Sequence, residues 1–102
     1  MLRSLFLGLF AIFSVAIYAN NKIRIKAEEH FSRGEWKEAS EIYNILISSE
    51  KNNLSLYAPS IIAAGKCNNY NRVIEYIVFS ENCGIPLDSV FNRTLTLSLK
   101  VR

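Results

Sequence analysis

A spacing of apolar and small residues that recurs after 34 positions constrains the fold of this chain more than any other feature. Residues 34–43 read GEWKEASEIY, and a degenerate copy of the same spacing begins at residue 68. The first set is Gly34, Trp36, Ala39 and Tyr43, and the second set is Asn68, Tyr70, Val73 and Ile77. Internal repeats of this length are typical of helical hairpins that stack, because one hairpin alone cannot bury its apolar face. We therefore expect an all-α fold.

The first hairpin is predicted over residues 22–50. Apolar residues at positions i, i+4 and i+8 from Ile23 mark its first helix, and apolar residues at i, i+3, i+7 and i+10 from Trp36 mark its second helix. Both spacings place the apolar side chains on one face of a helix. Gly34 lies between the two runs, and glycine allows the tight turn that antiparallel helices need.

The second hairpin is predicted over residues 54–83, after the polar stretch at residues 51–53. Its first helix is marked by Tyr57, Ile61 and Ala64, and its second helix by Tyr70, Val73 and Ile77. Because proline is tolerated only in the first turn of a helix, Pro59 requires the first helix to begin near Ser55 or Leu56.

A third, capping helix is predicted over residues 88–100. Gly84 is well placed just past the end of the second hairpin, and Pro86 cannot extend that helix. Asp88 then offers an N-cap for the last helix. Residues 22–102 thus form about two and a half units, which we expect to build a short right-handed stack of antiparallel hairpins.

Small residues should let the helices approach closely where they pack. Ala39 and Ala64 hold these places in the two hairpins. Larger side chains are expected to fill the space between the layers: Trp36, Tyr43, Tyr70 and Ile77. The last hairpin of a stack exposes an apolar face, so we expect another protein surface to cover that face.

Residues 1–21 form a separate, apolar segment. Residues 2–19 contain one charged residue, and eighteen helical residues are about 27 Å long, enough to cross the apolar core of a bilayer. The basic residues that flank this segment are Arg3, Lys22, Arg24 and Lys26. Since basic side chains suit contact with lipid headgroups, we predict a single-pass membrane anchor. The alternatives are a cleaved secretory signal peptide and an organelle-targeting presequence, which would place the protein in a secretory or organellar lumen.

The charge of the chain argues against nucleic acid as a partner. The net charge is +3, but four basic residues precede the first acid, Glu28. From Ala27 onward the eight Lys and Arg residues are balanced by nine Asp and Glu residues, a net charge of about −1. A groove that binds nucleic acid needs clustered positive charge to contact phosphates, and this part of the chain does not supply it.

The two cysteines are not expected to pair within the chain. Cys67 and Cys83 lie at opposite ends of the predicted helix between them, which is roughly 20 Å long. A disulfide requires Cα atoms closer than about 7 Å. Two free thiols favour a reducing compartment.

The hairpins resemble two families of helical repeats. Residues 31–46 resemble the turn and second helix of a tetratricopeptide repeat, with Gly34, Trp36, Ala39, Tyr43 and Leu46 in register. Residues 57–100 look more like a pentatricopeptide repeat, through Tyr57-x-x-x-Ile61, AAGK at residues 63–66, Val73-x-Glu75 and CGIPLD at residues 83–88. The spacing of 34 residues is that of the tetratricopeptide family.

The pentatricopeptide resemblance implies single-stranded RNA as a ligand. In proteins of that family, two residues of each repeat select a base, and their matches here are Ala58 and Asp88. Alanine has no hydrogen-bonding side chain, so this pair cannot specify a base edge. Repeats of this kind also add affinity one base at a time, which makes readout by a single repeat implausible.

The sequence contains no convincing catalytic, metal or cofactor site. His30 is the only histidine, and its neighbours Glu28 and Glu29 point in different directions on a helix. Glu35, Glu38 and Glu41 form an acidic strip that is typical of a solvated helix face. No phosphate-binding glycine loop, CxxC pair or Ser/His/Asp arrangement is present.

We therefore predict a non-catalytic protein–protein interaction module, tethered to a membrane, that acts as a scaffold or as a small accessory subunit of a larger membrane assembly. Leu97, Leu99 and Val101 alternate near the C-terminus and are candidates for contact with a protein or peptide partner. The alternative function is an organellar, pentatricopeptide-type RNA-binding protein. The 102 residues are either a complete product or the front of a longer repeat array.

Overall fold

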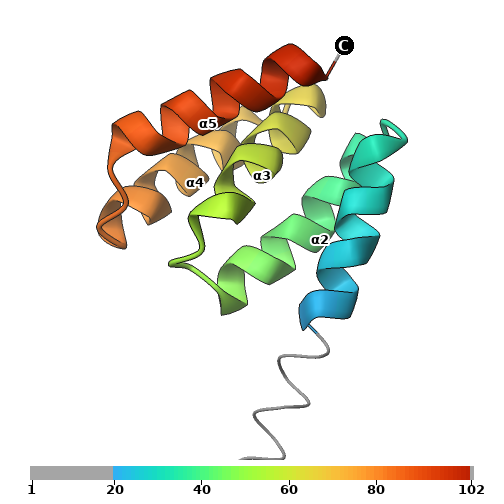
Figure 1. Cartoon of the computed structure of the whole chain (residues 1–102), viewed down its shortest axis with the longest axis horizontal. Helices are drawn as coiled ribbons and strands as arrows, with labels where there is room; N and C mark the ends of the chain where they lie inside the picture. The colour runs from blue at the N-terminus through green and yellow to red at the C-terminus, as the bar shows by residue number, and fades with distance from the viewer. Residues whose placement is uncertain (1–19, 102) are drawn as a thin grey trace, which may run out of the picture.

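The computed structural model describes residues 20–101, and these residues form five helices (Figure 1). The N-terminal helix is described over residues 20–32. It is followed by α2 (Trp36–Ser49), α3 (Leu54–Lys66), α4 (Tyr70–Asn82) and α5 (Leu87–Lys100). The prediction of an all-α fold is confirmed. Three or four residues separate successive helices, and the helices pack in chain order, with α3 in contact with α2, α4 and α5.

The predicted membrane segment, residues 2–19 with Arg3, lies outside the described residues. Within residues 20–101, no helix has both the length and the hydropathy that crossing a bilayer requires.

Three turns of the chain, at Gly34, Asn68 and Gly84, have the same geometry, and the first two lie 34 residues apart. Gly34 has a φ of +74° and Asn68 a φ of +60°, so both adopt the left-handed conformation. In each turn the N–H of the following residue donates to the carbonyl four positions before the left-handed residue, at 2.9 Å. Asparagine tolerates this conformation because its short polar side chain can bond locally, and the Asn68 Oδ1 accepts a hydrogen bond from the Tyr70 hydroxyl at 3.0 Å. The spacing repeated in the sequence therefore corresponds to a repeated turn.

The substitution Gly34→Ala is expected to lower the free energy of unfolding by about 1–2 kcal/mol, because alanine is strained at positive φ. Space is not the obstacle, since the nearest atom to an added Cβ is Trp36 Nε1 at 4.0 Å. Gly65→Ala is the matched control. Gly65 lies within α3 and an added Cβ would have no neighbour within 4 Å, so alanine should raise the stability by roughly 0.5–1 kcal/mol. Urea denaturation followed by circular dichroism measures both, and effects of the same sign would contradict this account of the turn.

All five helices contribute to one hydrophobic core, centred on α3. The residues of this core are Ala27, Ala39, Tyr43, Leu46, Ile47, Leu56, Tyr57, Ala63, Ala64, Tyr76 and Val90. Ala39 and Ala64, the two small residues expected at close contacts, are fully buried. The Tyr57 ring is fully buried as well, and its hydroxyl donates to the Lys51 carbonyl at 2.6 Å, which fixes the turn between α2 and α3.

The expectation that Tyr70 packs between the layers is wrong. Tyr70 is 62% exposed, whereas Tyr76 is fully buried and its hydroxyl donates to the Asn44 Oδ1 of α2 at 3.2 Å. The buried side chains of α4 are Tyr76 and Ser80, one turn apart, and Tyr70 falls at the edge of the face that they define. The repeat spacing predicted that Tyr70 would contribute the aromatic side chain of α4 to the core, and Tyr76 contributes it instead.

Two helix ends also differ from the predictions. α3 begins at Leu54, after the Asn53 side chain caps it, so Pro59 is the sixth helical residue and lies in the second turn rather than the first. Because proline has no N–H, the Ser55 carbonyl lacks its usual donor four residues later. α5 begins at Leu87, which puts Asp88 in the first turn instead of at the N-cap. A carboxylate in that position still stabilises the helix through its dipole.

Candidate binding cleft

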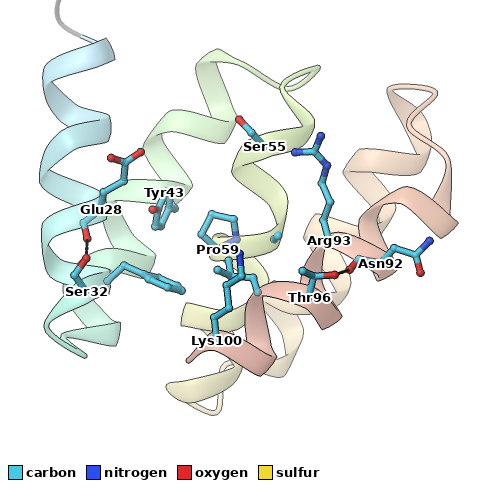
Figure 2. Close-up of a pocket in the computed structure, with 12 residues that line it drawn as sticks. Glu28, Ser32, Tyr43, Ser55, Pro59, Asn92, Arg93, Thr96 and Lys100 are labelled. Carbon is cyan, nitrogen blue, oxygen red and sulfur yellow. Dashed lines mark hydrogen bonds between the residues drawn. The ribbon is translucent and has the colours of Figure 1, made fainter. Parts of the chain in front are cut away.

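A cleft of about 530 Å³ separates the N-terminal hairpin from α3 and α5 (Figure 2). Its lining comes from four helices, namely the N-terminal helix, α2, α3 and α5. The residues that line it are Glu28, Phe31, Ser32, Tyr43, Ser55, Ala58, Pro59, Asn92, Arg93, Thr96, Leu97 and Lys100. Because helices far apart in the sequence form its walls, the cleft exists only in the folded chain.

Aromatic packing holds the hairpin side of the cleft. The Phe31 ring packs edge-on against Trp36, with centroids 5.0 Å apart, and edge-on against Tyr43 at 6.3 Å. Such pairs contribute about 0.5–1.5 kcal/mol beyond the area that they bury. On the α3 side, Ala58 and Pro59 provide a small, apolar floor. The apolar part of the cleft is therefore preformed.

Arg93 and Lys100 give the α5 wall a positive charge. They lie seven residues apart, hence two turns or roughly 10 Å apart on the same face of α5. Figure 2 shows both extending from α5, with Glu28 and Ser32 on the N-terminal helix opposite. Within residues 20–101 neither cation forms an ion pair, and neither does Glu28. These charges are available to a ligand.

Tyr43 is the most buried titratable side chain in the lining of the cleft. Burial, with the nearby Glu28 carboxylate as a smaller cause, raises the pKa of its hydroxyl to about 12, and Arg24 opposes the shift. The phenol is therefore neutral at physiological pH. It can contribute an apolar ring to the cleft, and it is poorly suited to act as a general base.

A second, more polar hollow of about 470 Å³ adjoins the cleft at the C-terminal end of α5. It is lined by Phe31, Ser32, Arg33, Gly34, Trp36, Lys100 and Val101. Three of these residues also line the first cleft, so the two hollows form a continuous groove along the N-terminal hairpin.

The single histidine of the chain lies beside the first turn, next to a carboxylate. His30 Nδ1 lies 3.1 Å from the Glu35 Oε1, and Arg33 adds a weaker contact to the same carboxylate at 3.9 Å. These contacts among His30, Arg33 and Glu35 stabilise the turn between the N-terminal helix and α2. Among residues 20–101, no three His, Cys, Asp or Glu side chains are grouped so as to hold a metal ion. Cys67 is exposed, Cys83 is half-buried, and both are free thiols in this region.

The residues predicted to pack the repeat divide into three classes. Ala39, Tyr43, Tyr57 and Ala64 are buried, Trp36, Ile61, Val73 and Ile77 are half-buried, and Gly34, Tyr70 and Gly84 are exposed. Gly84 follows α4 with a φ of +78°. Of the proposed acidic strip, Glu38 and Glu41 are exposed, whereas Glu35 is engaged with His30.

Of the three residues proposed as a partner contact, Leu99 lies apart from the other two. Leu97 lines the cleft and Val101, past the end of α5, lines the adjoining hollow, whereas Leu99 is 71% exposed. Leu99 and Leu97 separate because residues 87–100 are helical, and residues two positions apart on a helix point in nearly opposite directions. The sequence reasoning also missed Arg93, Thr96 and Lys100, whose spacing of three and four residues could have indicated a common face.

The other predicted residues lie outside the cleft or beneath it. Lys22 and Lys26 are exposed on the N-terminal helix, and Arg24 is half-buried. Of the pair proposed to select an RNA base, Ala58 is 5% exposed on the cleft floor, whereas Asp88 is exposed in the first turn of α5 and does not line the cleft.

Comparison of the chain with protein-family models, with curated proteins and with solved structures finds no match.

Proposed function

We propose that this chain is a non-catalytic protein-interaction module whose cleft binds a short segment of a partner protein. The observation that supports this most directly is the cleft between the N-terminal hairpin, α3 and α5, with its volume of about 530 Å³. A concave, largely apolar surface with a few polar groups at its edges has the form that peptide and small-ligand sites share. The preformed aromatic packing around Phe31 lowers the cost of ordering the site on binding.

We further propose that the helices are a short, right-handed stack of tetratricopeptide-like hairpins. The turns at Gly34 and Asn68, which repeat the same conformation and hydrogen bond, support this description. In this proposal the segment at residues 2–19 tethers the module to a membrane as a scaffold or accessory subunit of a larger assembly. Lys22 and Lys26 are exposed directly after that segment, where they suit contact with lipid headgroups.

The chemistry of the cleft favours a partner segment that combines acidic and apolar residues. Arg93 and Lys100 are two unpaired cations at a spacing of roughly 10 Å, and carboxylates of a bound segment would pair with them. Phe31, Pro59 and Leu97 offer apolar surface between them. The Ser55 carbonyl, which Pro59 leaves without a helical donor, supplies an acceptor for a backbone N–H.

Selection of randomised short peptides against the full chain in detergent micelles tests this proposal. We expect the selected peptides to be enriched in acidic and apolar residues. The double charge reversal Arg93→Glu with Lys100→Glu should weaken their binding by roughly tenfold or more, because each charge-assisted hydrogen bond contributes about 1.5–3 kcal/mol. Fluorescence anisotropy with a labelled, selected peptide measures the change.

The matched control is Lys37→Glu with Lys51→Glu, which makes the same change in net charge at two exposed sites outside the cleft. Binding should change by about twofold at most, since exposed charges are screened. An equal loss in the control would overturn the cleft as the binding site. Binding of single-stranded homopolymeric RNA that the cleft reversal abolishes would overturn a peptide as the ligand.

A further inference from the structure

The exposed apolar surface of the molecule is concentrated on its last two helices. Among the described residues, eight of the ten exposed large apolar side chains belong to α4 and α5, which pack on each other. On α5 they recur every four residues and form a stripe, the α5 stripe, made of Leu87, Phe91, Leu95 and Leu99, with exposed fractions of 49–71%. Contiguous apolar surface of this kind marks an interaction site on a soluble domain.

The repeat shows that this end of the molecule is an uncovered layer. Ser40 of α2 is buried, and Asn44, one turn later on the same face, accepts a hydrogen bond from α4. The positions 34 residues later are Ile74 and Val78 of α4, which are 60% and 44% exposed. The positions that are covered on the first hairpin, Ser40 and Asn44, thus correspond to exposed apolar residues, Ile74 and Val78, on the second hairpin.

The two cations of α5 lie off the stripe. Arg93 and Lys100 line the cleft on the opposite side of the helix, whereas Asp88 is exposed in the first turn and borders the stripe at that end. The hydroxyls beside the stripe are already satisfied, since Thr94 Oγ1 donates to the Val90 carbonyl at 2.7 Å and Ser98 donates to Leu95 at 2.7 Å. Burying the stripe would therefore leave neither cation nor these hydroxyls without a partner.

We propose that the α5 stripe is the interface of a two-fold symmetric dimer with a second copy of this chain. The stripe is self-complementary, because its four residues are evenly spaced along one helix. When two copies of α5 pack antiparallel across a two-fold axis, Leu87 meets the partner copy's Leu99, and Phe91 meets its Leu95. A two-fold interface requires this kind of self-matching surface.

The size of the stripe agrees with a weak to moderate dimer. At roughly 100 Å² of exposed surface per side chain, the stripe presents on the order of 400 Å² of apolar area. Apolar atoms make up about two thirds of homodimer interfaces, so the whole interface would bury on the order of 1,200 Å² over both copies. That value is at the lower limit of specific, stable interfaces.

Head-to-tail stacking is disfavoured by the other end of the molecule. The exposed residues of the N-terminal helix and α2 are largely charged and include Lys26, Glu29, Lys37 and Glu41. Their only exposed large apolar residues in the described region are Ile25 and Ile45. An apolar stripe has no complementary surface there, so association should close at two copies. This dimer leaves the proposed peptide cleft open, because the two surfaces lie on opposite sides of α5.

Sedimentation equilibrium of the full chain in density-matched detergent micelles tests the dimer. The wild type should reach a dimer in the micromolar range. Phe91→Glu and Leu95→Lys should each weaken dimerisation at least about tenfold, since each buries an unpaired charge. An equimolar mixture of the two variants should restore the dimer. In the mixed dimer, the Glu introduced at position 91 of one copy meets the Lys introduced at position 95 of the other. The second pair remains apolar, because Leu95 of the first copy still meets Phe91 of the second.

Ile45→Glu is the control, an exposed apolar residue on α2 that should leave dimerisation unchanged. Circular dichroism of each variant establishes that it is folded, which is expected because Phe91 and Leu95 are 64% and 49% exposed. A monomeric wild type, growth beyond dimers, a dimer that survives both stripe variants, or a mixture that stays monomeric would each overturn the proposal.

Discussion

Replacement of Tyr76 by alanine is expected to lower the free energy of unfolding by about 3–5 kcal/mol, the usual cost of truncating a large buried aromatic side chain. Tyr76 is fully buried in α4, and its hydroxyl donates to the Asn44 of α2. The alanine variant therefore loses apolar burial and a link between two hairpins. A domain of about 80 residues has a total stability of roughly 4–12 kcal/mol, so this variant should be close to unfolding at room temperature.

Tyr70→Ala is the matched control for Tyr76→Ala. Both residues are tyrosines of α4, but Tyr70 is 62% exposed and its hydroxyl bonds only to Asn68 in the preceding turn. Its loss should cost about 1 kcal/mol or less. Tyr76→Phe, which removes only the hydroxyl, should cost about 0.5–1.5 kcal/mol. Urea denaturation monitored by circular dichroism gives all three values, and equal losses for the two alanine variants would contradict the position of α4 in the core.

Alkaline pH should unfold this chain in the window between pH 10 and pH 12. Burial raises the pKa of Tyr43, Tyr57 and Tyr76 from 10.0 to about 12, with neighbouring groups, such as Cys83 beside Tyr57, as lesser causes. The folded state thus keeps three phenol protons that the unfolded chain releases. The stabilising effect is complete below pH 10 and is lost as the pH rises toward 12, at up to about 1.4 kcal/mol per pH unit for each tyrosine.

Two optical signals measured on one sample test this pH dependence. The near-ultraviolet absorbance of tyrosinate reports ionisation, and far-ultraviolet circular dichroism reports the helices. We expect the signal of the buried tyrosines to rise together with the loss of helix. Tyr43→Phe should reduce the number of protons released on unfolding by about one, because phenylalanine cannot ionise, and the pH transition should become shallower. Full ionisation of all tyrosines near pH 10 with the helices intact would be the contrary result.

The periodicity of the sequence was sufficient to predict the helices and the turns between them. Gly34 and Asn68 mark the two turns because left-handed backbone favours these two residue types, and the apolar spacing from Trp36 marks α2. These signals are local, so they can be read from neighbouring residues alone. The small buried residues Ala39 and Ala64 were found in the same way.

The cleft could not be predicted, because it depends on how α5 packs against α3. Arg93 and Lys100 become neighbours of Glu28 and Ser32 only through that packing. The error over Tyr70 has the same origin, since Tyr70 has the right residue type for the core but the packing of α4 buries Tyr76 instead. The error over Leu97 and Leu99 has a different origin. A helix was itself predicted over residues 88–100, and residues two positions apart on a helix point in nearly opposite directions.

The packing of the helices in chain order has a consequence for how the protein forms. Most contacts of this fold join helices that are neighbours in the sequence. In folds dominated by such local contacts, each contact closes only a short loop and little chain entropy is lost. Such folds form in microseconds to milliseconds. Synthesis at a ribosome adds residues far more slowly than that, with the N-terminal part first. The N-terminal hairpin can therefore become stable once α3, which packs against α2, has emerged, and each later helix can then join a surface that is already in place.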